Sequence, residues 1–584
     1  MKRFFLFALV ATVFAACSTA TLEMPIPSNE IWYTSSNGNV IKPYSGYFNS
    51  NATAMQLFGA NITSNIYKNG VGVITFDGDV TTIGDYAFYN CKALTSVTIP
   101  DSVTTIGNYA FRDCDALTSV TIPDSVTTIG DYAFIYCYAL KSVTIPDSVT
   151  TIGGGAFAFC YALTSVTIPD SVTTIERYAF LGCDALKAFY GKFASADNRC
   201  LIVDGVLNSF APAGLTTYSI PNSVTTIGDS AFDYCRALTS VTIPDSVTTI
   251  GDWAFIGCSA LTSVTIPDSV TKIGNEAFRD CDALKAFYGK FASTDNRCLI
   301  VNGVLKSFAP AGLTTYSIPD SVTTIGHSAF AYCSALTSVT IPDSVTTIGH
   351  SAFFNCDALT SVTIGNSVTT IGESAFAACD ALTSITIPDS VTEIRLLAFR
   401  DCDALKTFYG KFASEDNRCL IVDGVLNSFA PAGLTTYSIP NSVTTIGGYA
   451  FSDCSALKSV TIPDSVTTIG YYAFCNCDAL TSVTIPDSVT TIESSAFYGC
   501  DALTSITIPD SVTTIGGSAF YSCRALKEVY CKPTTPPSLG GSNVFDYNAS
   551  GRRIYVPTAS VSAYKSATYW SEYASAIYPY TFTE

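Results

Sequence analysis

The chain has 584 residues, of which 48% are apolar and only 13% are charged. This apolar content excludes a disordered chain, and the net charge of −18 disfavours nucleic-acid binding because an acidic surface repels phosphate groups. Two histidines in the whole chain leave little material for acid–base catalysis or a metal site near neutral pH. Composition therefore predicts a binding or structural protein without a cofactor, not an enzyme.

The first 17 residues have the features of an export signal. A basic start precedes the apolar segment from Phe4 to Ala16, which is too short to cross a bilayer comfortably. Ala15 and Ala16 then precede Cys17, and the segment resembles a bacterial lipoprotein signal, in which the cysteine is lipidated and becomes the mature N-terminus. The alternative is an ordinary secretory peptide. We expect an exported protein, lipidated at Cys17 and tethered by residues 18–30, on the bacterial outer membrane at the cell surface.

Residues 31–80 are expected to form a β-rich cap at the N-terminal end. The text EIWYTSSNGNVIKPY predicts a hairpin that turns at Asn37–Gly38. The text NGVGVITF predicts a strand that leads into the following array.

A 23-residue repeat fills residues 81–530. The text LTSVTIPDSVTTIGNYAFRDCDA begins at Leu94, and its opening returns at Leu117. The spacing L-x-x-V-x-I predicts a short strand with Val97 and Ile99 inward, which Pro100 ends. The following V-x-x-I-G-x-x-A-F-x-x-C predicts tight turns or a short helical segment on the other side. One unit is too small to bury its own apolar side chains, so the units must stack on one another.

Longer units interrupt this array near residues 186–214, 284–312 and 405–433. They share the text FYGKFAS-x-DNRCLIV-x-GVL-x-SFAPAG. In the first of them CLIVDGVL, centred on Asp204–Gly205, predicts a hairpin that stands off the stack.

The repeat resembles the BspA-like, or treponemal-type, leucine-rich repeat family of bacterial surface proteins. The matching text is L-x-x-V-x-I-P-D-S-V-x-x-I-G-x-x-A-F-x-x-C, over about three-quarters of the chain. The resemblance implies a leucine-rich repeat solenoid with a stacked parallel β-sheet on one face and turns or short helical segments on the other. It also implies adhesion to host matrix, to cells or to other bacteria.

Residues 531–584 are expected to form a C-terminal cap of one strand and one helix. CKPTTPPSLGG is a Pro/Gly-rich break, RIYVP predicts a strand, and SVSAYKSATYWSEYASAI predicts a short amphipathic helix. This ending also resembles the C-terminal segment of bacterial proteins of the family.

The repeated cysteines and the two histidines favour structural roles. Cysteines at equivalent positions have Cβ vectors that run side by side, which disfavours disulfides, and a small apolar side chain suits a core position. We therefore expect buried thiols. His327 and His350 lie one unit apart and should stack at the outer edge. Solvated histidines are a simpler reading than a weak metal contact, and no metal site is predicted.

The turn Pro-Asp-Ser allows two further readings. Its recurring Asp caps the turn through a backbone N–H or, stacked unit on unit, recruits Ca²⁺; replacement by Asn in some units favours capping. Asp-Ser-Val also resembles an acceptor for O-glycosylation in exported proteins of gut bacteria. Ser102 and Ser125 are candidate sites of this kind.

The long units supply the candidate ligand contacts. Most regular units have Thr at the exposed strand position, and the long units replace it with Tyr, followed by Lys and Arg. Tyr and Arg are favoured contact residues. The candidates are Tyr190, Lys192, Arg199, Tyr288, Lys290, Arg297, Tyr409, Lys411 and Arg418. The alternative is that Tyr covers the base of the hairpin.

We therefore predict a surface adhesin whose partners are host extracellular-matrix or cell-surface proteins, or glycans, with no nucleic acid. Many equivalent contacts along a repetitive sheet favour avidity over single-site affinity. One alternative is a glycan-capture protein of an uptake system, and another is a structural spacer that binds nothing. The varied positions flanking Ala-Phe, such as Tyr132 and Trp253, are either drift or a second recognition surface.

Overall fold

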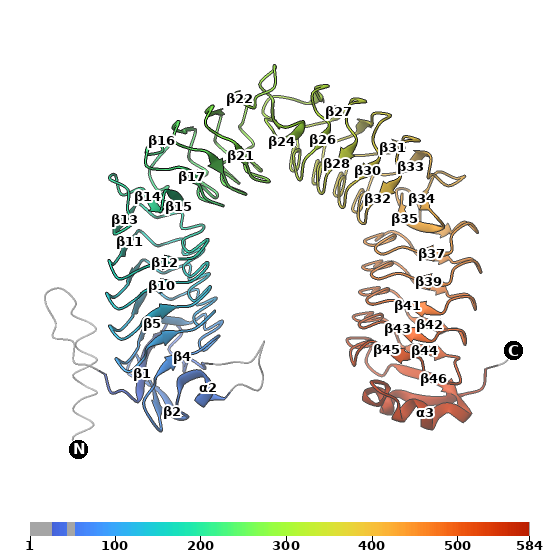
Figure 1. The fold of residues 1–584 in the computed structure, drawn as a ribbon. Helices are drawn as coiled ribbons and strands as arrows, with labels where there is room; N and C mark the ends of the chain where they lie inside the picture. Colours follow the sequence, from blue (N-terminus) through green and yellow to red (C-terminus); the bar gives the residue numbers. More distant parts are fainter. Residues whose placement is uncertain (1–25, 44–52, 583–584) are drawn as a thin grey trace. The chain divides into compact units, whose positions relative to one another are not determined.

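The computed structural model describes residues 26–43 and 53–582 (Figure 1). The chain divides into two compact units, residues 1–292 and 293–584, which we call unit 1 and unit 2 and describe separately. The predicted lipidation site Cys17 lies outside the described residues.

Each regular coil of the stack contributes two short strands, which we call its first and second strands. First strands pair in parallel one coil apart, as Val97, Val120 and Val143 do. In unit 1 they are β5 (Leu94–Thr98), β7 (Ser119–Thr121), β9 (Ser142–Thr144), β11 (Ser165–Ile168), β13 (Ala188–Gly191), β16 (Thr217–Ser219), β18 (Ser240–Thr242), β20 (Ser263–Ile266) and β22 (Ala286–Gly289). In unit 2 they are β25 (Thr315–Ser317), β27 (Ser338–Thr340), β29 (Ser361–Thr363), β31 (Ser384–Ile387), β33 (Thr407–Gly410), β36 (Thr436–Ser438), β38 (Ser459–Thr461), β40 (Ser482–Thr484), β42 (Ser505–Ile508) and β44 (Glu528–Cys531).

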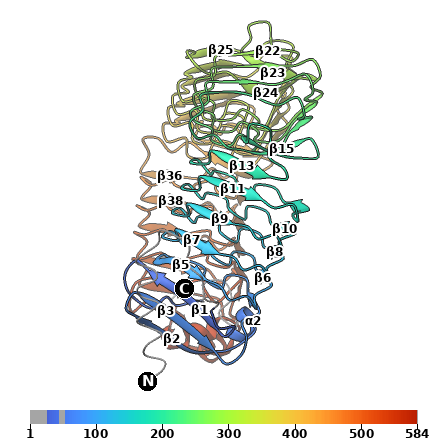
Figure 2. The same cartoon turned by 90° about the vertical axis from the view of Figure 1, so that its left-hand side faces the viewer.

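The second strands form another parallel column, which the sequence did not predict (Figure 2). Each has two residues, usually Thr-Ile, with the Ile buried. In unit 1 they are β4 (Thr82–Ile83), β6 (Thr105–Ile106), β8 (Thr128–Ile129), β10 (Thr151–Ile152), β12 (Thr174–Ile175), β17 (Thr226–Ile227), β19 (Thr249–Ile250) and β21 (Lys272–Ile273). In unit 2 they are β26 (Thr324–Ile325), β28 (Thr347–Ile348), β30 (Thr370–Ile371), β32 (Glu393–Ile394), β37 (Thr445–Ile446), β39 (Thr468–Ile469), β41 (Thr491–Ile492), β43 (Thr514–Ile515) and β45 (Ser538–Leu539).

The rest of each coil is a loop around Ala-Phe, which we call the loop face. Its backbone also bonds coil to coil: the Tyr109 amide donates to the Asp131 carbonyl (2.9 Å) and the Phe111 amide donates to the Ala133 carbonyl (2.7 Å). A coil therefore has three sides that are hydrogen-bonded to its neighbours. Of the two structures expected around Ala-Phe, tight turns or a short helical segment, the structure has turns.

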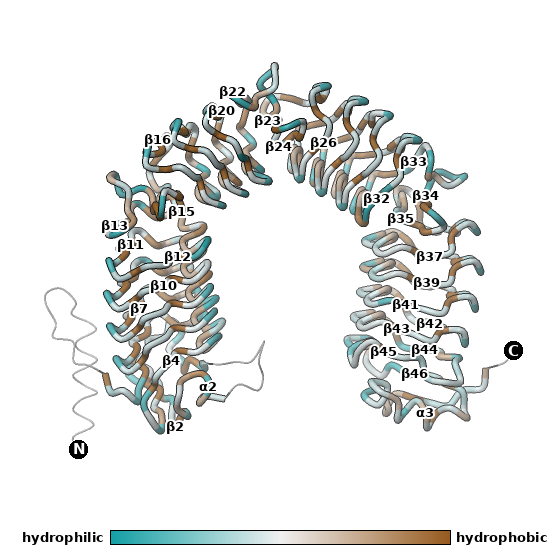
Figure 3. The backbone as a smooth tube through the Cα atoms, in the orientation of Figure 1, coloured by the Kyte–Doolittle hydropathy of each residue, from teal (hydrophilic) through white to brown (hydrophobic). Residues whose placement is uncertain are grey.

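The interior of the stack consists of buried apolar side chains, and apolar and polar residues alternate along the coils (Figure 3). Val97 and Ile99 are 2% and 3% exposed, so the predicted inward face is confirmed. Phe111 and Phe134 stack with ring centroids 5.0 Å apart. The cysteines from Cys91 to Cys531 are buried and free, and the Cys137 thiol donates to the Phe111 carbonyl (3.2 Å). The predicted burial of these thiols is confirmed.

The long units contain the predicted hairpins, but these do not stand off the stack. The strands are β14 (Cys200–Val203) and β15 (Val206–Phe210), β23 (Cys298–Val301) and β24 (Val304–Phe308), and β34 (Cys419–Val422) and β35 (Val425–Phe429). β15 pairs in parallel with the second strand β17, with Leu207 opposite Ile227. Leu201 and Leu207 are fully buried. A hairpin projecting into solvent would expose these side chains, so burial of its apolar face seats it in the second column.

The N-terminal cap also differs in one respect from the prediction. It consists of β1 (Glu30–Ser35), α2 (Ala54–Phe58), β2 (Ile62–Lys68) and β3 (Val71–Phe76). β1 pairs with β3 on one edge and with β5 on the other, so neither edge is left for a partner strand that follows Asn37–Gly38. The hairpin turns instead at Asn69–Gly70, where both residues have positive φ, between β2 and β3.

Residues 531–584, the predicted C-terminal cap, contain the predicted strand and helix and two strands more, β45 and β47 (Ile577–Tyr580). β46 (Arg553–Pro557) extends the column of first strands, and 3₁₀ turns over Thr558–Ser560 and Trp570–Ala576 flank α3 (Val561–Ser566). Strand β47 pairs in parallel with β46. Trp570 and Tyr564 are fully buried and close the end of the core.

Candidate binding surface

The outer side of the first strands is a ladder of small hydroxyl side chains. Thr98, Thr121 and Thr144 stand in register, and the serines two residues earlier form a second row. Thr121 and Thr144 are exposed, whereas the valines between the two rows are buried. This face offers many equivalent hydrogen-bonding groups at the spacing of the coils.

Tyrosines interrupt the ladder at the long units, as the sequence predicted. Tyr190 pairs with Thr167, Tyr288 with Thr265 and Tyr409 with Thr386. Their exposed fractions are 46%, 47% and 46%, so each presents a ring to solvent in the same way. The glycine after Tyr190 is required, because a Cβ on Gly191 would lie 2.0 Å from the Ile168 carbonyl oxygen. At the C-terminal end Tyr530 and Tyr555 occupy the same position and stack at 5.0 Å.

The candidate lysines bond to the backbone of the preceding coil. The Lys192 ammonium donates to the carbonyls of Asp170 (3.1 Å) and Val172 (2.8 Å). Lys290 and Lys411 make the equivalent pairs of bonds with the coils before them. These ammonium groups complete the turn of the preceding coil, which ties the tyrosine-bearing strand to it.

The candidate arginines bond within the long unit itself. Arg199 donates to the carbonyls of Ala211 (3.2 Å) and Ala213 (3.0 Å). Arg297 and Arg418 repeat these bonds in unit 2. Sequence analysis brought these nine residues together as one contact set; the structure gives the lysines and arginines backbone partners and leaves the tyrosine rings facing outward.

A polar cluster that the sequence analysis missed holds the base of each hairpin. Around β14 the Ser195 hydroxyl donates to Asp197 (2.5 Å), and the Cys200 sulfur lies 3.1 Å from the Tyr218 hydroxyl. Burial opposes ionisation of Asp197, but hydrogen bonds from Ser195, the Arg199 amide and Tyr218 outweigh it and hold the pKa of this carboxyl below its usual value. Burial also raises the pKa of Cys200 to about 12. The cluster recurs around Cys298 and Cys419.

The Pro-Asp-Ser turn is held by its serine. Ser102 donates to the Val80 carbonyl (2.6 Å) and Ser125 to the Val103 carbonyl (2.5 Å), each one coil earlier. Asp101 and Asp124 are exposed. The serine, not the aspartate, supplies the recurring bond of this turn, and O-glycosylation of Ser102 and Ser125 stays a prediction.

The two histidines lie beside each other one coil apart, as expected, but their rings do not stack: the centroids of His327 and His350 are 5.9 Å apart and the ring planes are tilted by 48°. Among the described residues no group of three or more His, Cys, Asp or Glu side chains is placed to hold a metal ion. Within residues 26–43 and 53–582 no helix is long and apolar enough to cross a membrane.

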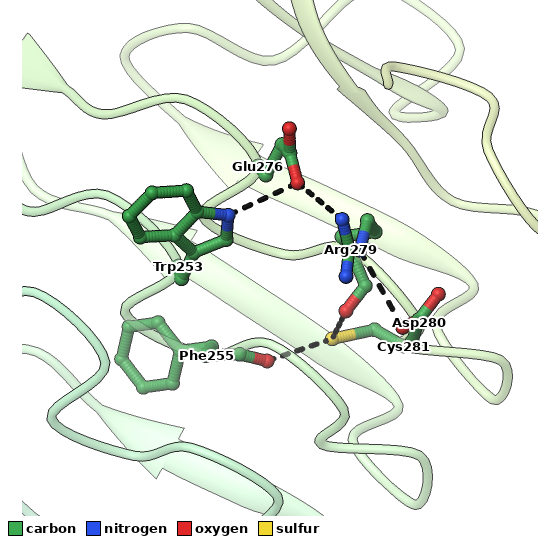
Figure 4. A network of polar contacts seen from close by, with 6 residues as sticks. All are labelled: Trp253, Phe255, Glu276, Arg279, Asp280 and Cys281. Carbon is green, nitrogen blue, oxygen red and sulfur yellow. Dashed lines mark hydrogen bonds and ion pairs between the residues drawn. The ribbon is translucent and has the colours of Figure 1, made fainter. Parts of the chain in front are cut away.

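The loop face has side-chain contacts from coil to coil at its most varied positions. Figure 4 shows one such network, in which the Trp253 indole donates to Glu276 (3.0 Å) and Arg279 bonds to the same carboxylate (2.5 Å). Arg279 also pairs with Asp280 (3.5 Å), next to the buried Cys281. Trp253 is 37% exposed. The varied residues therefore contact the residues at the same position of the next coil, which are 23 positions away in the sequence.

The parallel coils, the buried leucine and cysteine columns and the absence of long helices in the described parts define a leucine-rich repeat protein. The family model for the BspA type leucine rich repeat region matches residues 61–187, 207–297, 305–415 and 426–550, in six copies. The chain belongs to this family, which confirms the resemblance seen in the repeat. The repeat family and its fold are typically non-enzymatic binding scaffolds.

Several solved bacterial structures are similar. A leucine rich cell surface protein from Faecalibacterium prausnitzii is 30% identical, with 76% of this chain and 95% of the other covered and a TM-score of 0.37. A leucine-rich repeat protein from Eubacterium ventriosum is 25% identical, with 61% and 98% covered and a TM-score of 0.40. One from Bacteroides ovatus is 22% identical, with 93% and 100% covered and a TM-score of 0.24. No curated protein matches the chain.

Proposed function

We propose that this protein is a surface adhesin that binds host matrix proteins, host cells or other bacteria through the outer side of its first strands. The observation that carries the proposal is the matched set of half-exposed tyrosines, Tyr190, Tyr288 and Tyr409, within a uniform Ser/Thr ladder. Tyrosine gives a large, rigid, amphipathic contact at low entropic cost. Repetition of the contact favours avidity for a partner that is itself repetitive.

The proposal includes export and a lipid anchor at Cys17 on the outer membrane, and a non-enzymatic role. The N-terminal signal supports export. The F. prausnitzii relative is described as a cell surface protein, which supports a surface location. For the anchor we expect the mature chain to partition into the detergent phase of Triton X-114, and Cys17→Ala to move it to the aqueous phase. Detergent partitioning of the Cys17→Ala variant would contradict lipidation at this residue.

The contact surface is tested by returning the three tyrosines to the residue of the regular units: Tyr190→Thr, Tyr288→Thr and Tyr409→Thr together. Because Thr occupies this position in neighbouring coils, the variant should fold. Binding to immobilised matrix proteins, mucins and cells should fall at least about tenfold. The control is Tyr547→Ser with Tyr569→Ser, which removes tyrosines that are 71% and 42% exposed elsewhere. Unchanged binding of the triple variant would contradict the proposed contact surface, and absence of binding by the wild type would leave a spacer role.

A further inference from the structure

A cluster of aromatic side chains lies on the loop face of unit 1, away from the first strands. We call it the tyrosine patch and define it as Tyr109, Tyr132, Tyr136, Tyr138, Phe159 and Tyr161. Its rings form stacked pairs one coil apart: Tyr109–Tyr132 (5.1 Å), Tyr136–Phe159 (5.2 Å) and Tyr138–Tyr161 (5.3 Å). Tyr138 and Tyr161 are 40% and 45% exposed.

The pairs join into one surface. Tyr136 lies 5.9 Å from Tyr138, and Phe159 lies 6.2 Å from Tyr161. The guanidinium of Arg112 lies 5.6 Å from the Tyr109 ring and 5.8 Å from the Tyr136 ring, which links the first pair to the second. The patch therefore consists of ring surface and phenol hydroxyls repeated at the step of the coils.

Several charged groups surround the patch. Arg112 pairs with Asp113 (3.2 Å), and Lys92 pairs with Asp115 (3.5 Å). The Asp131 carboxylate accepts the Gly154 amide (2.7 Å). Three carboxylates therefore lie around the patch against two cations, which disfavours an acidic ligand.

Backbone conformation shows that the core does not call for aromatic residues here. Tyr109, Tyr132, Tyr136 and Phe159 have φ of 56°, 55°, 62° and 58°, a region that bulky residues seldom adopt. The chain uses glycine at the same positions in other coils, as at Gly155 and Gly182. In unit 2, Ser351 and Ser374 stand where Tyr109 and Tyr132 stand in unit 1, and Asp357 and Asp380 replace Tyr138 and Tyr161.

We propose that the tyrosine patch binds a neutral, extended polysaccharide. A pyranose ring has an apolar C–H face and a rim of hydroxyls, which matches the ring faces and phenol groups of tyrosine. The residue repeat of an extended polysaccharide is about as long as the step between coils, so successive sugars meet equivalent side chains. The excess of carboxylates around the patch and the chain's net charge of −18 both disfavour acidic glycans. This site is separate from the proposed adhesive face and does not depend on it.

The test measures retardation of the full chain in native gels that contain neutral β-glucan, mannan or xylan. We expect at least one of them to retard the protein, with little change at high salt. The variants Tyr109→Ser with Tyr132→Ser, and Tyr138→Asp with Tyr161→Asp, copy residues that unit 2 already has at these positions. Each pair should weaken binding at least about tenfold.

The matched control is Tyr498→Ala with Tyr521→Ala, which removes another stacked pair (5.3 Å) from a loop face in unit 2 and should leave retardation unchanged. The first-strand triple variant should also bind as the wild type does, which separates this site from the adhesive face. Circular dichroism melting checks folding. Should a patch variant fail to fold, Tyr138→Phe with Tyr161→Phe keeps the rings and should still weaken binding by removing two hydroxyls.

Three results would overturn the proposal. They are retardation by none of the neutral polysaccharides, equal retardation of folded patch variants and wild type, and binding only to heparin or only to proteins. The last would indicate an ionic or protein-binding surface instead.

Discussion

The coils over residues 86–161 and those over residues 328–380 have interiors built in the same way and differ in the residues of the loop face. Phe111 and Phe134 stack at 5.0 Å in the first stretch, and Phe353 and Phe376 stack at 5.1 Å in the second. The thiols also match: Cys137 donates to Phe111, and Cys379 to Phe353. On the loop face, serines and aspartates in the second stretch replace the tyrosines at equivalent positions in the first. The interior is therefore fixed by stacking, and the loop face is free to take on recognition.

The largest expected effect, summed over the buried thiols, is an alkaline loss of stability in both stretches. Burial raises the pKa of Cys137 and Cys356 well above the ordinary value of 9.0. The folded state then keeps protons that the unfolded chain releases, so stability is complete below about pH 9 and falls as the pH rises. Each such thiol contributes up to about 1.4 kcal/mol per pH unit. Urea unfolding between pH 7 and pH 10 measures the slope.

As a control, one thiol is removed from each stretch. Cys137→Ala and Cys356→Ala should each reduce the slope by the same amount. A slope that neither change affects would show that other groups cause the alkaline loss.

The next effect is on the shared interior. Phe134→Ala and Phe353→Ala each remove a fully buried ring from the stack. Each should lower the free energy of unfolding by about 3–5 kcal/mol, because the cavity cannot be refilled by the rigid neighbouring coils. Denaturant titration of the two variants should give equal losses. Clearly unequal losses would mean that the two interiors are not equivalent.

The smallest effect is on the loop face. Tyr132→Ser removes a stacked ring that is partly exposed, and Ser374 shows that serine fits this position. The expected change in the free energy of unfolding is about 1 kcal/mol or less, since an aromatic pair contributes about 0.5–1.5 kcal/mol and the strained φ is eased for serine. Thermal melting compares the variant with Phe134→Ala. A loss as large as that of the core variant would make the tyrosines part of the structural framework.

The sequence predicted the first strands because their residues alternate. Val97 and Ile99 point inward and Thr98 outward, and a period of two over five residues is readable. The second strands have only two residues, as in Thr105–Ile106, so no alternation reveals them. Asp204–Gly205 correctly marked a hairpin, but pairing with β17 depends on residues 20 positions later. Asn37–Gly38 has the same turn signal, but no hairpin forms there because β3 and β5 already occupy both edges of β1.

The candidate site, like the fold, was predictable only in part. Tyr190 could be placed in the Thr position by counting along the repeat, and the pairing with Thr167 follows. The partners of Lys192 and Arg199 are backbone carbonyls. Because every residue has one, the sequence does not show which carbonyl accepts the bond. The tyrosine patch was visible as aromatic residues 23 positions apart, but only the ring distances join its columns into one surface.

The hydrogen bonds of the loop face run from each coil to the next at a constant step, and the core contacts do the same. A gene that loses or duplicates 69 bases between two regular coils therefore encodes a chain in which each backbone hydrogen bond between coils has an equivalent partner. A chain with one regular coil more or fewer therefore keeps its backbone bonding pattern without new stabilising mutations. The length of the stack and the number of its equivalent surface positions can then change in steps of one coil.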